Sequence, residues 1–474
     1  MNLFRSVAVT ATLACGISSA ALAQDLTTAE SAQVDKIVSD TLAATGTPSA
    51  SVAIVRGGRI AFAKAYGKQS ETIRTPVDDA PYQIASISKQ FAAAAILLLQ
   101  DEGKLSLDDP IGKYVPGITD GDKITIRQIL SHTSGLQDYW PQDYSFAAMA
   151  HPVTPQQILD RWAKKPLDFA PGAQWQYSNT GYVVAGMIVE KVSGMPLLDF
   201  LKARIFKPLG ITAYDQDLAV GPTFPQGYGR HALGPVRVEP PAGKGWLFAA
   251  GELSMSARDL AKWDVARIDR TILTPQDWAT QETSIKLNDG KDSQYGLGVF
   301  SVTEDGRHIV EHSGEAVGFI SENIIYPDDK AAFVVLTNTW SSGAASAIAG
   351  TLAKTFLPPP AQSGPSTVAA DAAAAKTVRL VYDQLRAGKL DRSLLTEDAN
   401  YYFTPTTQAD YHDSLAPLGD PDTFEQAGHT ALRGGFVIRG YTVKYKDRTL
   451  RVSTFFTPGD DGKIEQFLVR PASE

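Results

Sequence analysis

The sequence predicts an α+β protein in which an antiparallel sheet flanked by helices is joined to an all-α lobe, with a small α+β domain at the C-terminus. A hairpin pattern near the N-terminus and a series of strand patterns after residue 295 enclose a mostly helical stretch from about 105 to 290. A chain with this layout builds one sheet from its two ends and carries the helices as a separate lobe. A Pro- and Ala-rich segment then separates a last unit of about one hundred residues, a common domain size.

The first residues predict a cleaved secretory signal. "MNLFR" is a short basic start, "SVAVTATLACGISSA" an apolar core, and "ALAQ" an A-x-A cleavage site before Gln24. We therefore expect residues 1–23 to be removed and the protein to be periplasmic or secreted by a bacterium. Cys15 is the only cysteine, so the mature chain has no disulfide or thiolate chemistry. Lipid attachment at Cys15 is an alternative, although Thr12 stands where such sites usually carry Leu.

Composition excludes several classes of protein. The 474-residue chain carries a net charge of −8 and no block of clustered Lys and Arg, which argues against a nucleic-acid groove. No run after the signal reaches the ~18 apolar residues that a membrane span requires. No His, Asp and Glu cluster has metal-ligand spacing, so we expect neither a metal nor a cofactor. The expected partner is a small-molecule or peptide substrate, with cell-wall peptides among the candidates, and the oligomeric state is left open.

The elements follow in a simple order. A helical pattern ends at Gly46, and residues 51–67 alternate about Gly57-Gly58 as a hairpin with a primed turn. An apolar helix then ends near Gly103. The helical stretch includes "ITIRQILSH", "TPQQILDRWAK", "TGYVVAGMIVEKVSG" and "SARDLAKWDVAR". The later strands are "YGLGVFSV", "RHIVEHSG", "GFISENIIY" and "AAFVVLTNT", and the helix "SGAASAIAGTLAKTF" closes this part.

These patterns place a first folded domain at residues 24–356 and a linker, "LPPPAQSGPSTVAADAAAA", at 357–375. Residues 376–474 form the accessory domain, in which an amphipathic helix stops at Gly388 and three antiparallel strands follow. This helix-then-strands order faintly resembles the NTF2-like or cystatin-like class. Fold alone does not assign it a function.

The first chemistry-bearing motif is Ser86-x-x-Lys89 in "PYQIASISKQF", the only Ser-x-x-Lys in the chain. Residues three apart on a helix share a face, so the Lys89 amine can reach the Ser86 hydroxyl. The run "FAAAAILLLQ" that follows is apolar nearly all round, which predicts a buried helix whose surroundings lower the pKa of Lys89 towards that of a base. The alternative is a capping serine and a solvated lysine at an ordinary helix start.

Two further stretches become candidates for catalysis or substrate binding when they are considered together with this motif. Tyr177-Ser178-Asn179 precedes a helix, where a phenol can relay protons and an amide can orient the lysine or a substrate. Taken alone, these residues are more typical of a turn tyrosine and a helix cap. His312-Ser313-Gly314 ends a strand whose edge can dock an extended substrate. Taken alone, this stretch is more typical of a surface histidine beside a turn.

The three motifs, in this order, resemble the serine β-lactamase and D-Ala-D-Ala carboxypeptidase superfamily. The chain is similar in particular to the class C β-lactamase-like branch, of the peptidase S12 and family VIII esterase type. Its D,D-peptidases, D-aminopeptidases and carboxyl esterases carry stretches like "LDDPIGKYVPG", "ILSHTSGL", "FKPLGI" and "AAGELSMSARDLAKW". The resemblance covers roughly residues 30–356 and implies a β-lactamase/transpeptidase-like fold for that part of the chain.

The resemblance implies a serine hydrolase with an acyl-enzyme mechanism. Ser86 would attack a carbonyl, and Lys89 and Tyr177 would share the proton transfers. Asn179 would position the substrate amide. The substrate oxyanion would lie between the backbone N–H groups of Ser86 and Glu315. A fold-stabilising role is expected for His132 in "SHTSG", and no Gly-x-Ser-x-Gly elbow supports an α/β-hydrolase triad.

One departure bears on the substrate. Class C β-lactamases usually carry Lys-Thr-Gly where this chain has His312-Ser313-Gly314, followed by acidic Glu315. A mostly neutral histidine and a carboxylate suit the β-lactam carboxylate poorly. The leading hypothesis is therefore hydrolysis of D-amino-acid-containing peptides or carboxyl esters. A class C-like β-lactamase and a catalytically silent module that binds cell-wall peptides or a partner are the alternatives.

Overall fold

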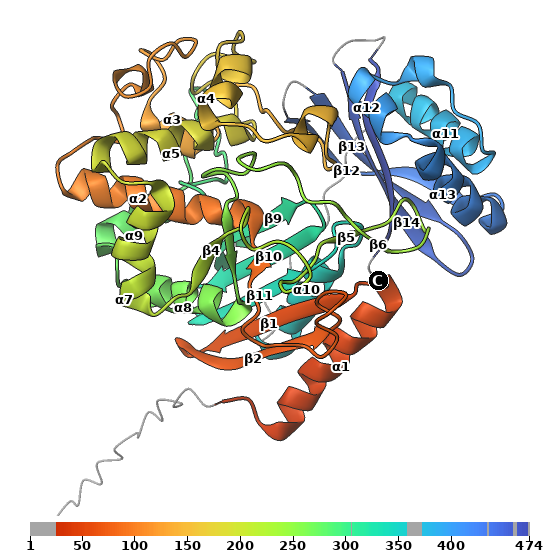
Figure 1. Cartoon of the computed structure of the whole chain (residues 1–474), viewed down its shortest axis with the longest axis horizontal. Helices are drawn as coiled ribbons and strands as arrows, with labels where there is room; N and C mark the ends of the chain where they lie inside the picture. The colour runs from red at the N-terminus through yellow and green to blue at the C-terminus, as the bar shows by residue number, and fades with distance from the viewer. Residues whose placement is uncertain (1–24, 305, 358–371, 434–435, 458–461, 473–474) are drawn as a thin grey trace, which may run out of the picture.

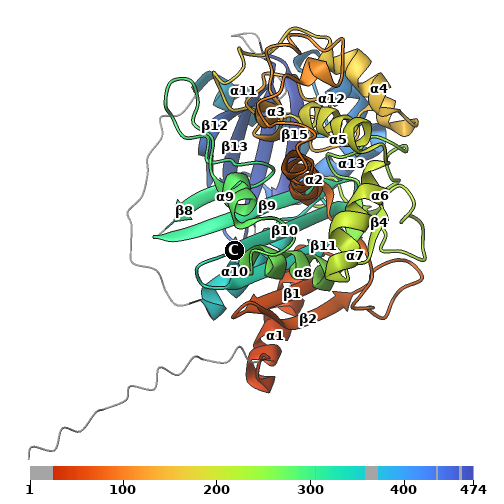
Figure 2. The same cartoon turned by 90° about the vertical axis from the view of Figure 1, so that its left-hand side faces the viewer.

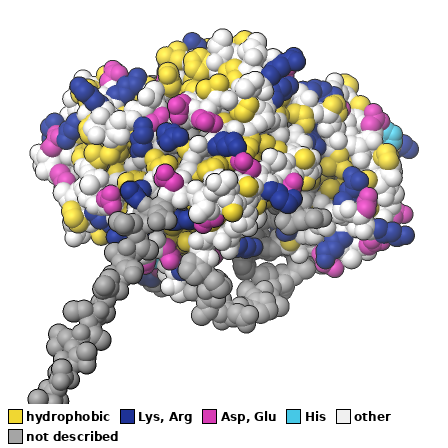
Figure 3. Space-filling model, turned by 90° about the horizontal axis from the view of Figure 1, so that it is seen from below, with side chains coloured by type: hydrophobic (Ala, Val, Ile, Leu, Met, Phe, Trp, Pro, Cys, Tyr) yellow, Lys and Arg dark blue, Asp and Glu magenta, His cyan; other side chains and the backbone are white. Residues whose placement is uncertain are grey.

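The structure, a computed structural model, describes residues 25–304, 306–357, 372–433, 436–457 and 462–472 (Figure 1). The predicted signal at 1–23, with Cys15, lies outside the described residues, as do residues 358–371 of the predicted linker. Within the described ranges, no helix is both long enough and apolar enough to cross a bilayer. On the face shown in Figure 3, basic and acidic side chains are interspersed.

One six-stranded sheet organises the larger part of the chain, and every neighbouring pair in it is antiparallel. Its strand order is β2-β1-β11-β10-β9-β8, so strands from the two ends of this region meet at its centre, as predicted. The strands are β1 (Ser49–Arg56), β2 (Arg59–Gly67), β8 (Phe300–Glu304), β9 (Arg307–Ala316), β10 (Phe319–Tyr326) and β11 (Ala331–Thr337). Gly57 and Gly58, with φ of 58° and 76°, form the primed turn of the first hairpin.

Helices cover both faces of this sheet. On one face α1 (Thr28–Thr45) and α10 (Ala344–Phe356) pack on Val52 and Val335 in one hydrophobic cluster. On the other face α8 (Ala257–Ile268) packs on Ala53 and Val334 in the largest cluster. Side chains of successive strand residues point to opposite faces, so both apolar faces of these central strands are buried. Continuous apolar runs such as "AAFVVLT" follow from this burial.

The helical lobe lies beside the sheet, as Figure 2 shows. Its long buried helix is α2 (Lys89–Asp101), in which every residue from Lys89 to Leu99 is buried. The other helices are α3 (Ile126–Leu130), α4 (Pro155–Ile158), α5 (Asn179–Ser193), α6 (Leu197–Leu201), α7 (Lys207–Leu209) and α9 (Pro275–Glu282). Two small sheets join them, β3 (Tyr82–Gln83) with β7 (Leu253–Met255) and β4 (Ala213–Asp215), and β5 (Tyr228–Gly229) with β6 (Arg237–Val238).

One predicted strand begins later than the sequence pattern suggests. The pattern places a strand from Tyr295, whereas β8 begins at Phe300. The intervening segment bends under α2, with Gly298 at a φ of 78°. A Cβ atom on Gly298 would lie 2.7 Å from the Lys89 carbonyl oxygen, so the residue must be glycine for the two segments to approach.

The C-terminal region has its own hydrophobic cluster, built around Tyr382, Tyr411 and Val452. Its helices are α11 (Ala372–Arg386), α12 (Glu397–Tyr402) and α13 (Pro405–Leu415). Its sheet is β12 (Thr423–Arg433), β13 (Phe436–Lys444), β14 (Thr449–Phe456) and β15 (Ile464–Pro471), in that order. The sequence predicts only three of these strands. The strand β12 is missing from the prediction because "TFEQAGHTALR" has little of the apolar alternation that marks a strand.

A buried polar network fixes the start of α2 against its neighbours. The Gln90 side chain accepts hydrogen bonds from Trp263 (3.1 Å) and Arg267 (2.9 Å) and donates one to Asn323 (3.0 Å). Arg267 is fully buried and also forms an ion pair of 3.0 Å with Glu282. The network thus holds the helix that begins at Lys89 against α8, α9 and β10.

We expect Arg267→Ala to be strongly destabilising, because it removes the buried cation that pairs with Glu282 and one of the two donors to the Gln90 side chain. Breaking a buried ion pair from one side typically costs about 3–5 kcal/mol of unfolding free energy. Urea unfolding of the variant and the wild type measures this loss of unfolding free energy. The matched control is Lys36→Ala, which removes an exposed ion pair with Asp40 and should change stability by less than about 1 kcal/mol. Equal effects of the two substitutions would contradict the expectation.

Candidate active site

A short turn between β3 and α2 presents Ser86. The preceding residue, Ala85, has a φ of 48°, a strained conformation for a residue with a Cβ atom. The Ser321 hydroxyl donates a 2.9 Å hydrogen bond to the carbonyl of Ile84 and ties the turn to β10. Ser86 is half-buried, whereas Ile84, Ala85 and Ile87 are buried. The turn therefore directs one hydroxyl towards the cleft and packs its other side chains into the core.

The Lys89 amine meets that hydroxyl, as the Ser-x-x-Lys spacing predicts. Its Nζ donates to Ser86 Oγ at 2.9 Å, to Asn179 Oδ1 at 2.8 Å and to the carbonyl of Ala250 at 2.7 Å. The residue is fully buried. In its neutral form an amine at this distance from a hydroxyl can accept its proton.

Asn179 is oriented by a residue that the sequence analysis missed. The Nδ2 group donates to Asp138 Oδ1 at 3.0 Å and Oδ2 at 3.2 Å, and the backbone N–H of Asn179 also donates to Asp138. Because the carboxylate can only accept, it fixes which end of the amide faces Lys89. Both side chains are buried. The only sequence signal for Asp138 is its place just after "SHTSGLQ".

Tyr177 lies over the lysine. The Lys89 Nζ is 4.9 Å from the centroid of the Tyr177 ring and 5.3 Å from that of Tyr182. On its other side, Tyr177 packs on His132, with ring centroids 4.2 Å apart. His132 Nδ1 accepts a 3.1 Å hydrogen bond from the backbone N–H of Ser178. His132 thus supports Tyr177 from behind, and the ring of Tyr177 lines the cleft.

His312 lies in the cleft wall and is electrically neutral. Burial and the nearby Lys89 charge lower the pKa of His312 to about 3. Its Nε2 lies 2.9 Å from the Tyr295 hydroxyl, and its Nδ1 lies 2.5 Å from the carbonyl oxygen of Ser313. Both ring nitrogens therefore have protein partners, and the ring carries no positive charge at neutral pH.

The strand β9 extends past its pairing with β8 at this point. Its pairing with β8 runs only as far as Glu311, opposite Phe300. The hairpin to β10 closes at Ala316 and Phe319, and the alternation of hydrogen bonds along an antiparallel pair then directs the backbone N–H groups of Ser313 and Glu315 away from β10. Gly314 lies against the turn before Ser86, where a Cβ atom would be 2.1 Å from the Ile84 carbonyl oxygen. The glycine therefore allows β9 to approach that turn.

Together these elements line a cleft of about 280 Å³. Of the predicted residues, Ser86, Tyr177, Asn179, His312, Ser313 and Glu315 line it, while Lys89 lies beneath Ser86 and Gly314 lies behind the strand edge. The remaining walls are largely apolar, and the sequence analysis did not identify them: Trp140, Gln142, Asp143, Trp175, Leu247, Phe300, Trp340 and Ile438. They come from segments far apart in the chain and share no local pattern.

The part of the chain that contains the large sheet and the helical lobe also matches known proteins. The sequence model of the Beta-lactamase family matches residues 34–355. A penicillin-binding protein of Bacillus subtilis is 29% identical over 309 residues, which cover 60% of this chain and 67% of that protein. The protein flp of Staphylococcus aureus is 27% identical over 327 residues, 66% of this chain and 64% of that protein. The chain thus spans about two thirds of the length of these curated relatives.

Solved structures have the same fold. A D-stereospecific amidohydrolase from Streptomyces is 29% identical, with a TM-score of 0.56 over 65% of this chain and 94% of that chain. An octameric penicillin-binding protein homologue from Pyrococcus abyssi is 22% identical, with a TM-score of 0.61 over 93% of this chain and 99% of that chain. This second likeness is one of fold, and it extends into the C-terminal region.

The neutral state of His312 makes a prediction about acid stability. The unfolded chain binds the imidazole proton with a pKa near 6.5, whereas the folded site binds it only near 3. Below about pH 6.5 the unfolded state therefore holds more protons, and the free energy of unfolding falls as the pH falls. Replacing the ring by an amide removes this contribution.

Urea unfolding of the wild type and of His312→Gln between about pH 7 and pH 4 measures the effect, for which linkage sets a slope on the order of 1 kcal/mol per pH unit. The wild type should lose stability more steeply than the variant. Parallel pH dependences of the two proteins would contradict a buried, neutral His312.

Proposed function

The chain belongs to the Beta-lactamase family of serine hydrolases, and from this premise we propose that it is an exported enzyme that hydrolyses D-amino-acid-containing peptides or carboxyl esters through an acyl-Ser86 intermediate. The observation that carries the proposal is the 2.9 Å hydrogen bond between the buried Lys89 amine and Ser86 Oγ at the floor of the cleft. A hydroxyl in contact with a buried amine is the arrangement that nucleophilic catalysis requires.

The proposed reaction has two halves. The Lys89 ammonium first releases one proton to solvent. Ser86 Oγ then attacks the substrate carbonyl while its own proton passes to the neutral amine, and the leaving amine or alcohol takes up that proton through Tyr177. Water then attacks the acyl-enzyme, the Ser86 oxygen regains its proton, and a carboxylic acid is released. The backbone N–H of Glu315, which points away from β10, supports a place for the oxyanion, together with the N–H of Ser86.

The charge of the third motif supports amides and esters over β-lactams as substrates. His312 occupies the third motif, and its pKa of about 3 leaves it uncharged at neutral pH. The Glu315 carboxylate is already engaged by Arg470 at 3.1 Å. A neutral amide or ester therefore suits this site better than an anionic β-lactam. The likeness to an amidohydrolase described as D-stereospecific supports the amide branch.

Replacement of the nucleophile tests the mechanism. Ser86→Ala should lower kcat/KM by about 10³-fold or more on p-nitrophenyl esters, D-Ala-D-Ala peptides and D-aminoacyl anilides, because no acyl-enzyme can form. The wild type should give a burst with an activated ester and a mass adduct on Ser86. Full turnover by Ser86→Ala would refute the proposal. Fast nitrocefin hydrolysis would instead favour a β-lactamase, and no reaction with any substrate would favour a binding module.

Replacement of the base tests the proton transfers. Lys89→Met removes the amine, and Lys89→Arg keeps a charge that cannot be lost, so both should lower kcat by about 10²–10⁴-fold. Stopped-flow measurement of acylation by an activated ester reports the step directly. Near-normal acylation by Lys89→Arg would show that deprotonation of residue 89 is not required.

A further inference from the structure

Among the residues that the structure describes, the C-terminal region contributes Ile438 to the candidate active-site cleft. Ile438, on β13, lines the cleft together with Trp140 and Trp340, whereas the remaining lining residues come from the larger part of the chain. It is half-buried. A side chain at this position limits the space available to a bound substrate.

The register of the C-terminal sheet explains why Ile438 faces the cleft. Ile438 pairs with Phe455, and Phe455 pairs with Gln466, so the three side chains lie in one row on one face. Two rows further along, Arg451 pairs with Arg470 on the same face. The opposite face packs on α11–α13, which lie on the outer side of the sheet in Figure 1. The inner face is therefore left to contact the larger region.

Contacts from β15 hold that inner face in place on both sides of the cleft. Gln466 Nε2 donates to Asp143 Oδ2 at 3.0 Å, and the Tyr144 hydroxyl donates to the backbone carbonyl of Glu465. Leu468 is 7% exposed and belongs to the main hydrophobic core. Arg470 forms its ion pair with Glu315 on β9. One strand thus bridges the helical lobe, at Asp143, and the large sheet, at Glu315.

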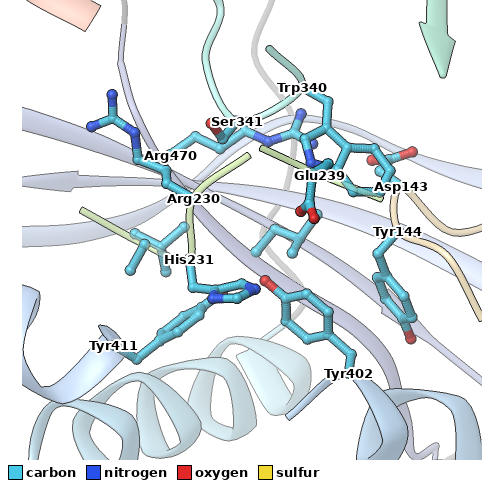
Figure 4. A pocket seen from close by; sticks show the side chains of 13 residues that line it. Asp143, Tyr144, Arg230, His231, Glu239, Trp340, Ser341, Tyr402, Tyr411 and Arg470 are labelled. Atoms are coloured by element: carbon cyan, nitrogen blue, oxygen red, sulfur yellow. The ribbon is translucent and has the colours of Figure 1, made fainter. Parts of the chain in front are cut away.

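The seam between the two regions is tightly packed where Trp340 meets Tyr402. Figure 4 shows the small cavity there, with Asp143 and Trp340 from the larger region facing Tyr402 and Arg470 from the C-terminal region. Its volume is about 30 Å³, which is on the scale of a single water. A ligand does not fit at this point of the seam, whereas a larger hollow of about 300 Å³ lies between Glu322 of the large sheet and Arg451 of the C-terminal sheet.

The two ends of the cleft differ in chemistry. Tyr177, the proposed proton relay to the leaving group, lies at the end formed by Trp175, Phe300 and His312. Asn179, which is expected to position the substrate amide, has its Nδ2 group 3.4 Å from the carbonyl of Trp140. We therefore assign the acyl group to the part of the cleft that Trp140, Trp340 and Ile438 line, away from Tyr177.

Resting on the proposed function, we propose that the C-terminal sheet is the specificity-determining wall of the acyl subsite. Ile438 sets the longest apolar acyl group that the enzyme accepts, and the contact between Arg470 and Glu315 holds the wall in position. The ligand class is an uncharged, compact aliphatic or aromatic acyl group, because the walls are largely apolar and the carboxylates of Glu315 and Asp143 are engaged by Arg470 and Gln466.

The wall is tested by measuring kcat/KM for a series of p-nitrophenyl esters whose acyl group lengthens from acetyl to dodecanoyl. In Ile438→Ala the ratio of octanoyl to butanoyl hydrolysis should rise about tenfold, the scale on which pockets discriminate methylene groups. In Ile438→Trp the ratio should fall. Val437→Ala is the matched control, because this truncation lies on the same strand but on the opposite face of the sheet. Its ratio should equal that of the wild type.

A second pair of variants tests the positioning role. Arg470→Ala should broaden the chain-length profile in the same direction as Ile438→Ala. Its control is Arg237→Ala, which breaks another ion pair between the two regions, with Asp410, at a site that does not line the cleft. Thermal unfolding of each variant checks that it is folded.

The outcomes separate the two proposals. Active enzymes whose chain-length ratios are unaffected by either Ile438 substitution would overturn the wall and leave the hydrolase proposal standing. A shift in Arg237→Ala as large as in Arg470→Ala would overturn the positioning role of Arg470. A wild-type chain without turnover on any ester would overturn the wall and the ester branch of the proposed function together.

Discussion

The buried amine of Lys89 is the interaction on which the rest of the site depends. An ammonium has three N–H donors, and burial is costly unless each finds an acceptor. The three acceptors come from three places in the chain, the turn at Ser86, the start of α5 at Asn179 and the loop at Ala250. Movement of any one of these segments would leave a buried donor unsatisfied. One side chain therefore holds the helical lobe and the nucleophile in a single geometry.

Many surrounding features serve this contact. Asp138 accepts from the Asn179 amide, so the amide oxygen is the end that faces the amine. Gly298 allows the segment before β8 to pass close to the Lys89 carbonyl, and Gly314 allows β9 to approach the turn at Ser86. The Gln90 network anchors the neighbouring residue of α2 from behind. A polar floor is thereby built into a cleft whose upper walls are mostly aromatic.

Local patterns in the sequence predict much of this arrangement and miss the rest for identifiable reasons. Ser86 and Lys89 are found because their spacing is that of one helical turn, and the two-residue turn at Gly57 and Gly58 is found because only glycine adopts two successive positive φ values without strain. Asp138 and Ala250 are missed because each acts through a contact distant in sequence. No periodicity in the chain reports such a contact.

The C-terminal region likewise contains elements that local sequence patterns predict and elements that they miss. The apolar alternation of β13 to β15 predicts three strands. The helix α13 is missed although Thr404 and Pro405 give it a regular start, since its sequence "PTTQADYHDSL" has few apolar residues. Neither Ile438 nor Arg470 carries a local sign of its place beside the cleft. Their roles arise from which face of the sheet the helices leave uncovered.

The connectivity of the large sheet also has a consequence for how the protein folds during its synthesis. Ala50 in β1 pairs with Thr337 in β11. The interior strand β1 is therefore synthesised long before its neighbour β11, and the two strands can pair only after β11 has been made. Contacts so distant in sequence slow folding, and the lone hairpin meanwhile offers an unpaired apolar edge to other chains. Nascent chains of this protein should therefore be most prone to aggregation before translation passes residue 337. A chaperone that covers β1 during that interval would raise the yield of active enzyme.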